Sequence, residues 1–337
     1  MIDDALRADL RRTFASALDH DDAGKARDAV LDAGWLDALR EDEAVAVALL
    51  FRLQGELRRD IGALDDVVLH HLAAGCPAVA GDMAVAYPVA QPGGQGSDIT
   101  HVTFPSRRSA PQLLWIDNPA SAQLQIVDVG GGEGGEKEHT VGGVDPSLGL
   151  HGFSARPAGP TTELTGEVAR AAWDAALAAG RIAVAHQMVA GARTLLTSAT
   201  DYARTRQQFG VPIGTFQAVK HRLAETLVAI SAADAATVAA ATAPSATRAA
   251  LAKVLAGRAA TAAAKNCLQV FGGIGFTTEH DFHRSFRRML VLDRLLGDGR
   301  SIERELGGAI RAGAIDGERV IDLDDALRLN VVDTAVG

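Results

Sequence analysis

The hydrophobic positions divide the chain into three zones. Up to about Leu72, apolar residues recur at the spacing of helices. The first helix is marked by Leu31, Trp35 and Leu39, and the second by Val45, Val47, Leu50, Leu53 and Leu57. Gly34 weakens the first helix, and Asp60 to Gly62 ends the second. This zone predicts an N-terminal helical domain over residues 1–76.

The second zone, from Pro77 to Thr165, has short apolar runs separated by turns rich in glycine and proline. The runs are Met83 to Tyr87, Leu113 to Ile116 and Leu124 to Val129. The turns include the clusters Gln91 to Gly94 and Gly130 to Gly135. Short runs with such turns are typical of strands. The sequence therefore predicts a small antiparallel β-domain over residues 77–165.

From Gly166 onward the helical spacing returns. A long helix is marked by Trp173, Leu177, Val184, Met188, Leu195 and Leu196, and the next by Phe216, Val219, Leu223, Leu227 and Ile230. Pro244 breaks the pattern, and Ser245 can cap a helix that runs to about Val270. Further helices are expected over Phe282 to Leu296 and from Ser301. The prediction is an antiparallel helical bundle over residues 166–337, within an α+β fold that is mostly α.

Composition narrows the functional classes. The chain has 337 residues, of which 47% are hydrophobic and 4% aromatic, so Ala, Leu and Val have to form the core. A net charge of −9 disfavours binding to nucleic acid or anionic lipid. The N-terminus resembles no signal peptide, and no apolar run reaches membrane-spanning length, so we expect a cytoplasmic protein that binds neither membranes nor nucleic acid. Cys76 and Cys267 are expected to be buried free thiols.

Two polar clusters suggest other ligands. The basic cluster His283-Arg284 and Arg287-Arg288 could belong to a pocket for a phosphorylated ligand or to a local nucleic-acid patch. His280 and His283 with Glu279 could suggest a metal site, but they lie where a helix begins and no further ligands accompany them. We therefore expect solvated or capping histidines and no metal.

One segment, Thr205 to Thr226, combines features of a phosphate-binding turn. Arg206, Phe209 and Gly210 form an R-x-x-F-G turn, and the helix that follows carries Gln217. The planar guanidinium of an arginine can hold two phosphate oxygens at once, and a glycine lets the backbone approach a ligand closely. The alternative is that Arg206 pairs with a surface carboxylate.

A second segment is the helix end formed by Gln269, Val270, Phe271, Gly272 and Gly273. Its glycines follow a helix rather than a strand, and G-x-G-x-x-G spacing is absent. It is therefore no dinucleotide fingerprint of a parallel sheet. By itself it could be an ordinary glycine cap.

Together the two segments resemble the flavin-binding half of the acyl-CoA dehydrogenase family, specifically from about Arg170 to Leu306. The order of the three zones is similar to that family's architecture, with the first two zones shortened. The resemblance implies FAD as cofactor, an acyl-CoA substrate and an electron-transfer flavoprotein as electron acceptor. It also implies that Arg206 binds the pyrophosphate of an FAD held mainly by a neighbouring subunit, that Phe209 packs on the cofactor and that Gln217 hydrogen-bonds it.

By the same resemblance, Gln269 to Gly273 contact the ADP portion of FAD across the subunit interface, through the glutamine side chain and the glycine backbone. Upstream, Gly94 to Asp98 weakly echo the family's segment over the flavin ring and the substrate. A hydrophilic loop is the alternative for that stretch.

Acyl-CoA dehydrogenation needs a carboxylate base for the proton α to the thioester carbonyl. In most of the family this glutamate shortly precedes a segment that resembles Ser301 to Arg304, and counting from the flanking motifs places it at Gly297 or Leu296. In a second group it lies on the preceding long helix, here at Gly180. None of these is a carboxylate. The catalytic residue is thus unknown from the sequence, with Asp298 a weak candidate.

Flavin motifs without a base resemble the shorter subunit of the actinobacterial heteromeric acyl-CoA dehydrogenases, which are α2β2 assemblies acting on CoA thioesters of steroid side chains. The resemblance implies that a paralogous partner supplies the glutamate while this chain completes the FAD site. Two alternatives stay open: a self-sufficient homotetramer that uses Asp298, and a non-catalytic flavin-binding or scaffold relative.

Overall fold

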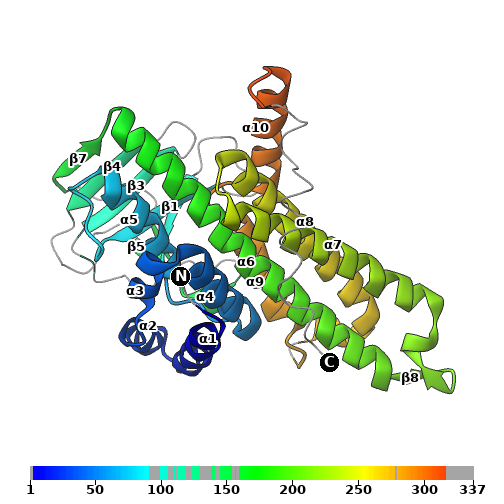
Figure 1. The fold of residues 1–337 in the computed structure, drawn as a ribbon. Helices are drawn as coiled ribbons and strands as arrows, with labels where there is room; N and C mark the ends of the chain where they lie inside the picture. The colour runs from blue at the N-terminus through cyan, green and yellow to red at the C-terminus, as the bar shows by residue number, and fades with distance from the viewer. Residues whose placement is uncertain are drawn as a thin grey trace.

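The computed structural model describes residues 3–90, 99–104, 110, 112–118, 123–128, 138–140, 145–153, 156, 159–277 and 279–315. The expectations for Gly94 to Asp98 and for the turns at Gln91 to Gly94 and Gly130 to Gly135 lie outside the described residues. Figure 1 shows N-terminal helices, a central β-sheet and a long C-terminal set of helices, as the sequence predicted.

The N-terminal part consists of α1 (Asp4–Leu18), α2 (Ala23–Asp32), α3 (Trp35–Glu41), α4 (Glu43–Leu57) and α5 (Ala63–Gly75). Aspartates cap the first, second and fourth of these helices by accepting backbone N–H bonds. The expectation of one helix through Leu31, Trp35 and Leu39 is wrong. Gly34, with φ of 86°, separates α2 from α3, because glycine adopts the left-handed conformation that ends a helix.

The sheet has seven strands in the order β5-β6-β2-β1-β3-β4-β7. Their bounds are β1 Ala84–Ala90, β2 Ile99–Thr103, β3 Gln112–Asn118, β4 Gln123–Asp128, β5 Glu138–Thr140, β6 His151–Phe153 and β7 Thr161–Leu164. The predicted antiparallel pairing holds except between β1 and β3, which run parallel, with Ala84 opposite Leu113. The reason is the chain path: β2 returns along one edge of β1, and the chain then crosses to the other edge, where β3 runs in the direction of β1.

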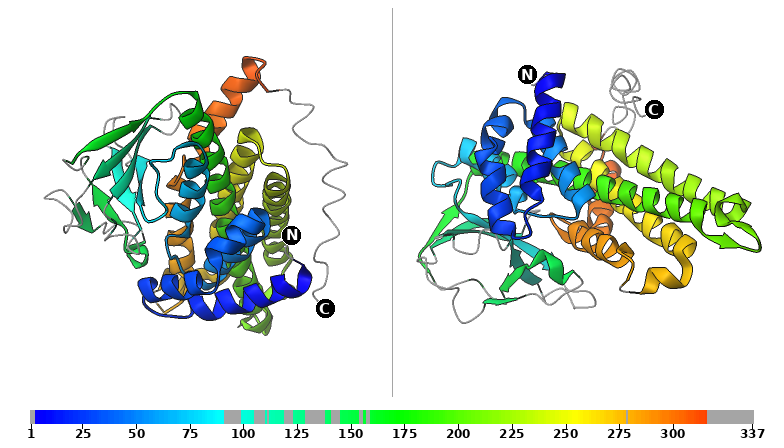
Figure 2. Two further views of the ribbon diagram at one scale, coloured as in Figure 1. Left: turned by 60° about the vertical axis from the view of Figure 1, so that its left-hand side comes forward. Right: turned by 90° about the horizontal axis from the view of Figure 1, so that it is seen from below.

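The C-terminal part is built on α6 (Glu167–Thr205), α7 (Gln217–Thr242) and α8 (Ala246–Phe271), which lie side by side and extend beyond the sheet (Figure 2). Two shorter helices follow, α9 (Phe282–Arg294) and α10 (Gly299–Arg311). The predicted cap is confirmed, because the Ser245 hydroxyl accepts the Arg248 N–H at 3.2 Å. Short elements complete this part: η2 Pro146–Leu148, β8 Gln207–Gln208, β9 Val211–Pro212, η3 Ile213–Thr215 and η4 Gly272–Phe276.

One hydrophobic core runs through all three parts, from Phe14 and Trp35 through Tyr87 to Trp173 and Leu292. Small residues bring its helices together. A Cβ on Gly55 of α4 would lie 2.2 Å from the carbonyl oxygen of Gln187 in α6, so only glycine permits this crossing.

Helix α7 packs against α6 and α8 and leaves much of its apolar surface open. Leu227 is 47% exposed and Val228 69% exposed. Among the described residues α7 alone is long and apolar enough to cross a membrane by length and composition, contrary to the sequence expectation. Its place in the bundle shows that it is one layer of the helical packing.

Candidate flavin site and the positions of the base

The R-x-x-F-G segment forms a hairpin at the end of α6. Strands β8 and β9 pair Gln208 with Val211, which leaves Phe209 and Gly210 as a two-residue turn. Their φ angles of 54° and 79° both lie in the left-handed region, as a type I′ hairpin turn requires. The turn holds the Phe209 side chain out of the core, and this residue is 93% exposed.

Arg206 lies at the base of this hairpin, and its guanidinium is exposed. No carboxylate of the described residues lies within ion-pair distance of it, so the alternative of a surface salt bridge finds no support there. Gln217, the first residue of α7, is also exposed. The hairpin thus offers a cation, an aromatic ring and an amide on one open surface.

The second motif ends α8. Val270 and Phe271 are buried, at 6% and 3% exposure, whereas Gln269 and Gly273 are exposed. The Phe271 ring packs on Tyr202 and on His280, with centroid distances of 5.5 and 4.1 Å. The two apolar side chains therefore fix the helix end. Gln269 and Gly273 are exposed, whereas Gly272 is partly exposed and its N–H donates to the Leu268 carbonyl.

The Tyr202–Phe271 contact joins the two motifs, because Tyr202 lies one helical turn before Arg206. Both motifs accordingly lie at the end of the bundle away from the sheet (Figure 1). Exposed aromatic side chains gather here: Phe209, Phe216 at 38% exposure and Phe276 at 78% exposure. Such clustering of exposed apolar rings marks a binding surface. An exposed arginine without an ion pair among the described residues, beside exposed aromatic rings, fits the pyrophosphate and adenosine parts of FAD.

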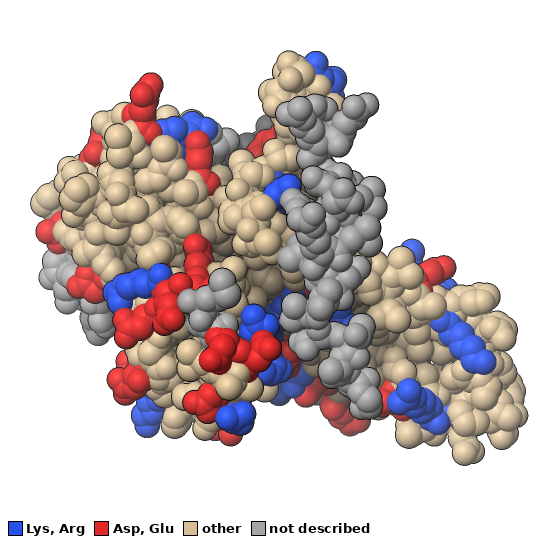
Figure 3. All heavy atoms as spheres, in the orientation of Figure 1, with Lys and Arg blue, Asp and Glu red and all other residues tan. Residues whose placement is uncertain are grey.

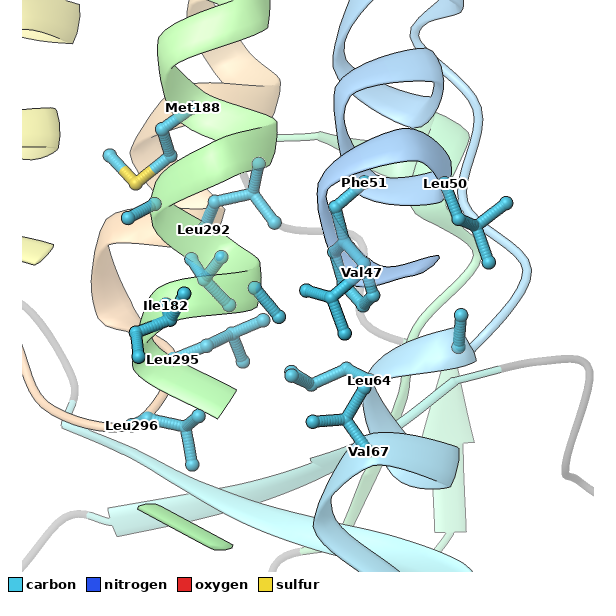
Figure 4. Close-up of a cluster of buried hydrophobic side chains, with 14 of the residues drawn as sticks. Val47, Leu50, Phe51, Leu64, Val67, Ile182, Met188, Leu292, Leu295 and Leu296 are labelled. Carbon is cyan, nitrogen blue, oxygen red and sulfur yellow. The ribbon is translucent and has the colours of Figure 1, made fainter. Parts of the chain in front are cut away.

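Two positions where the resemblance places the base meet in the core. A Cβ on Gly180 would lie 2.6 Å from Leu296 Cδ1, 3.5 Å from Val68 Cγ2 and 3.6 Å from Leu64 Cδ1. Leu296 is only 2% exposed. Figure 4 shows Leu295 and Leu296 beside α6, with Leu64 of α5 across from them. An aliphatic contact therefore fills the space at Gly180.

The third position, Gly297, is equally restricted. Its φ is 101°, and a Cβ there would lie 3.3 Å from Arg181 Nη2 and from Ile302 Cγ1. Leu296 itself has φ of 59°, which is unusual for a non-glycine residue and costs free energy. Gly180, Leu296 and Gly297 thus carry no carboxylate, and a side chain at either glycine would require its neighbours to shift.

Two buried cations hold the turn between α9 and α10. Arg181 Nε donates to the Leu296 carbonyl at 3.0 Å, and Lys253 Nζ donates to the carbonyls of Asp293 and Gly297 at 2.9 and 3.4 Å. Burial lowers the pKa of Lys253 to about 8, although Asp293 opposes that shift. The role of Lys253 was missed from the sequence. The available signal was its helical spacing to Ala249, Ala256 and Ala260, all of which are buried.

Asp298, the weak candidate for the base, makes hydrogen bonds that serve the structure. Its Oδ1 accepts the backbone N–H groups of Arg300 and Ser301, both at 3.0 Å, and so caps α10. To reach a substrate, this short side chain would have to leave the helix terminus.

The basic cluster is divided by burial. Arg288 is 6% exposed and donates to Asp145 at 2.7 Å, so it is no part of a surface patch, whereas Arg284 and Arg287 are exposed. His280 Nδ1 accepts the Phe282 N–H at 3.0 Å, which confirms the capping role. No group of three potential metal ligands exists in the described ranges. Cys76 and Cys267 are buried free thiols, as predicted.

Part of the chain is similar in sequence to acyl-CoA dehydrogenases. Residues 170–302 match the family model "Acyl-CoA dehydrogenase, C-terminal domain". Acyl-CoA dehydrogenase IpdE2 of Mycobacterium tuberculosis is 41% identical over 125 residues, which are 37% of this chain and 39% of that protein. IpdE2 of Mycolicibacterium smegmatis is 34% identical over 163 residues, 46% of this chain and 52% of that protein. The matches thus span about half of these relatives or less.

The fold agrees along nearly the whole chain. The Tcur3481–Tcur3483 steroid ACAD, solved as a variant, superposes with a TM-score of 0.71 at 21% identity, covering 91% of this chain and 98% of that one. The ChsE4–ChsE5 complex from Mycobacterium tuberculosis gives a TM-score of 0.66 at 20% identity, covering 92% and 98%. The sequence match therefore covers the acyl-CoA dehydrogenase C-terminal domain at residues 170–302, and the structural likeness extends the fold of these proteins over nearly the whole chain.

Proposed function

We propose that this chain is one subunit of an FAD-dependent acyl-CoA dehydrogenase that desaturates a CoA thioester between its α and β carbons. In this proposal the chain completes the FAD site and a paralogous subunit supplies the catalytic glutamate. The observation that carries the proposal is the contact of Gly180 with Leu296, beside Gly297. It leaves the family's positions for the base without a carboxylate, while the flavin motifs are intact and exposed.

Each exposed residue of the two motifs has a role in this proposal. Arg206 holds the pyrophosphate of an FAD bound mainly by the neighbouring subunit, and Phe209 and Gln217 contact the same cofactor. Gln269 with the backbone of Gly272 and Gly273 holds the ADP portion. When bound, FAD supplies the acceptor for the hydride that leaves the β carbon.

The apolar surface of the bundle supports a partner subunit. Leu227 and Val228 of α7 add to the exposed rings of Phe209 and Phe276. Figure 3 shows charged side chains gathered over the N-terminal helices, while the far end of the bundle in this view carries fewer. Exposed apolar area of this kind is typical of an interface. Two similar structures are of protein pairs, Tcur3481–Tcur3483 and ChsE4–ChsE5.

A relative supports a proposal for the substrate. One similar structure is a steroid ACAD. We propose a CoA thioester of a steroid side chain as substrate and an electron-transfer flavoprotein as the acceptor that reoxidises the flavin.

The test assembles this chain with a paralogous subunit and adds a CoA thioester without oxygen. We expect the visible flavin absorbance to bleach, also in Asp298→Ala, and to persist when glutamine replaces the partner's catalytic glutamate. If this chain alone bleaches and Asp298→Ala abolishes the bleaching, the self-sufficient homotetramer is correct and the proposal fails.

A further inference from the structure

A cavity of about 300 Å³ lies away from the two flavin motifs. Its walls come from the start of α4, from α5, from the first half of α6 and from the connection between α7 and α8. The apolar lining includes Val47, Ala178, Ile182, Ala241 and Pro244. A cavity of this volume reaches the lower range of ligand pockets in proteins.

The centre of the cavity and the contact between Gly180 and Leu296 lie on different faces of α6, although α5 borders both. Successive residues of a helix are about 100° apart, so Ala178 and Ile182 both lie about 160° from Gly180 around the helix axis. Both residues line the cavity, whereas Gly180 faces α5 and the Leu296 turn. The cavity is therefore distinct from the space at the positions of the base.

The charged groups of the cavity are acidic. Glu43 and Asp174 line it, and no lysine or arginine does so. The Asp174 carboxylate accepts both of its hydrogen bonds from Arg170 Nε, at 3.1 Å, on the outer side of α6. Glu43 Oε1 lies 2.7 Å from His71 Nε2, and both side chains are partly exposed. The Arg170 guanidinium offsets part of the Asp174 charge, and Glu43 keeps the opening on the acidic side, which disfavours anions such as the phosphates of a CoA thioester.

We propose that this cavity is a binding site for a neutral, largely hydrocarbon molecule that carries one hydrogen-bonding group. The apolar residues take the hydrocarbon part, and the His71–Glu43 pair takes the polar group at the opening. This site is additional to the proposed dehydrogenase function and does not depend on it.

The test uses two probes that differ in charge. N-phenyl-1-naphthylamine is neutral, and 8-anilinonaphthalene-1-sulfonate is the same ring system with a sulfonate. Fluorescence titrations are made on the full chain, alone and with its partner subunit. We expect saturable binding of one neutral probe per chain, at least ~10-fold tighter than binding of the anion, which corresponds to about 1.4 kcal/mol. Equal affinity for both probes, or no saturable binding, overturns the proposal.

Variants locate the site. Ala175 lines the cavity and is exposed, so Ala175→Trp closes the opening without burying a new side chain in the core. The control Ala171→Trp lies one turn earlier on α6 at an exposed position outside the lining. We expect Ala175→Trp to weaken the neutral probe at least ~10-fold and Ala171→Trp to leave it unchanged. Equal binding in both variants places the probe elsewhere and overturns the proposal.

A further variant separates charge from shape. Asp174→Asn removes one acidic group from the opening and keeps the size of the side chain. We expect tighter binding of the sulfonate probe with unchanged binding of the neutral probe. If the sulfonate affinity does not change, the carboxylates do not select the ligand, and that part of the proposal is wrong.

Discussion

Gly180 of α6 and Leu296 of the α9–α10 turn lie in direct contact, so that a Cβ on Gly180 would lie 2.6 Å from Leu296 Cδ1. This contact brings together two positions at which the family resemblance places a base. Both positions carry an apolar residue. Arg181 and Lys253 hold the turn by hydrogen bonds to the carbonyl oxygens of Leu296 and Gly297. Gly180 and Leu296 thus lie in a packed, buried region.

The contact predicts a stability effect that is specific to Gly180. Gly180→Ala should lower the free energy of unfolding by about 1–3 kcal/mol, because the methyl group overlaps Leu296. Gly191→Ala on the same helix is the control, since its Cβ would meet its nearest atom at 3.7 Å. Denaturant unfolding measures both variants. In the double variant Gly180→Ala/Leu296→Ala, the added methyl group should cost less than it does alone; full additivity would contradict the overlap.

Flavin retention should depend on Arg206. Arg206→Gln should lower the FAD content of the purified heteromer without changing its unfolding midpoint, because the side chain makes no ion pair with the described residues. Arg204→Gln is the matched control: Arg204 is also exposed and pairs with Asp201 at 3.5 Å on the helix surface. Flavin absorbance per protein measures the content. Equal loss in both variants would show that Arg206 has no particular role.

Lys253 should make stability rise with alkaline pH. Its pKa is 10.5 in the unfolded chain and about 8 in the folded protein. Between these values the unfolded chain binds the proton and the folded protein does not, so the free energy of unfolding gains up to roughly 3 kcal/mol as pH rises. Lys253→Met should lack this gain. Unfolding from pH 7.5 to 10 tests it, and parallel curves for the two proteins would refute it.

His186 should act at acidic pH. Burial, with a further contribution from Arg52, lowers its pKa to about 3. Below pH 6.5 the unfolded chain therefore binds a proton that the folded protein excludes, and stability falls by about 2 kcal/mol by pH 5. His186→Asn keeps an acceptor for the Arg52 N–H and should remove that fall. The exposed His221→Asn should not. If all three proteins lose stability equally, the claim that His186 stays neutral in the folded protein is wrong.

Asp298 should prove to be a capping residue. Asp298→Ala should cost about 1 kcal/mol through loss of the α10 cap, and Asp298→Ser should restore most of it because serine also accepts the N–H bonds. Thermal unfolding compares the three proteins. Equal stability of the Ala and Ser variants would contradict the capping role.

Local signals in the sequence predicted the elements that local chemistry determines. Ser245 before an alanine-rich run predicted the start of α8, and the glycines after Phe271 predicted its end. The conformations at the two proposed flavin motifs are likewise local, because each motif is one short segment. The split between α2 and α3 was missed because the apolar spacing outweighed the effect of Gly34, whose left-handed conformation is what ends α2.

Features that depend on distant residues could not be predicted. The parallel pairing of β1 with β3 depends on the path between them. The bond from Arg181 to Leu296 joins residues 115 positions apart. Counting along the chain gave Gly180 on one helix and Leu296 or Gly297 far from it as places for a base, and only the packing shows that Gly180 and Leu296 meet.

The most direct test of the central claim is the flavin content and solution mass of this chain, purified alone and after co-expression with a paralogous subunit of the same family. We expect a colourless or flavin-poor chain alone and a stable yellow heteromer with the partner. A yellow homo-oligomer that a CoA thioester bleaches without any partner would contradict the account.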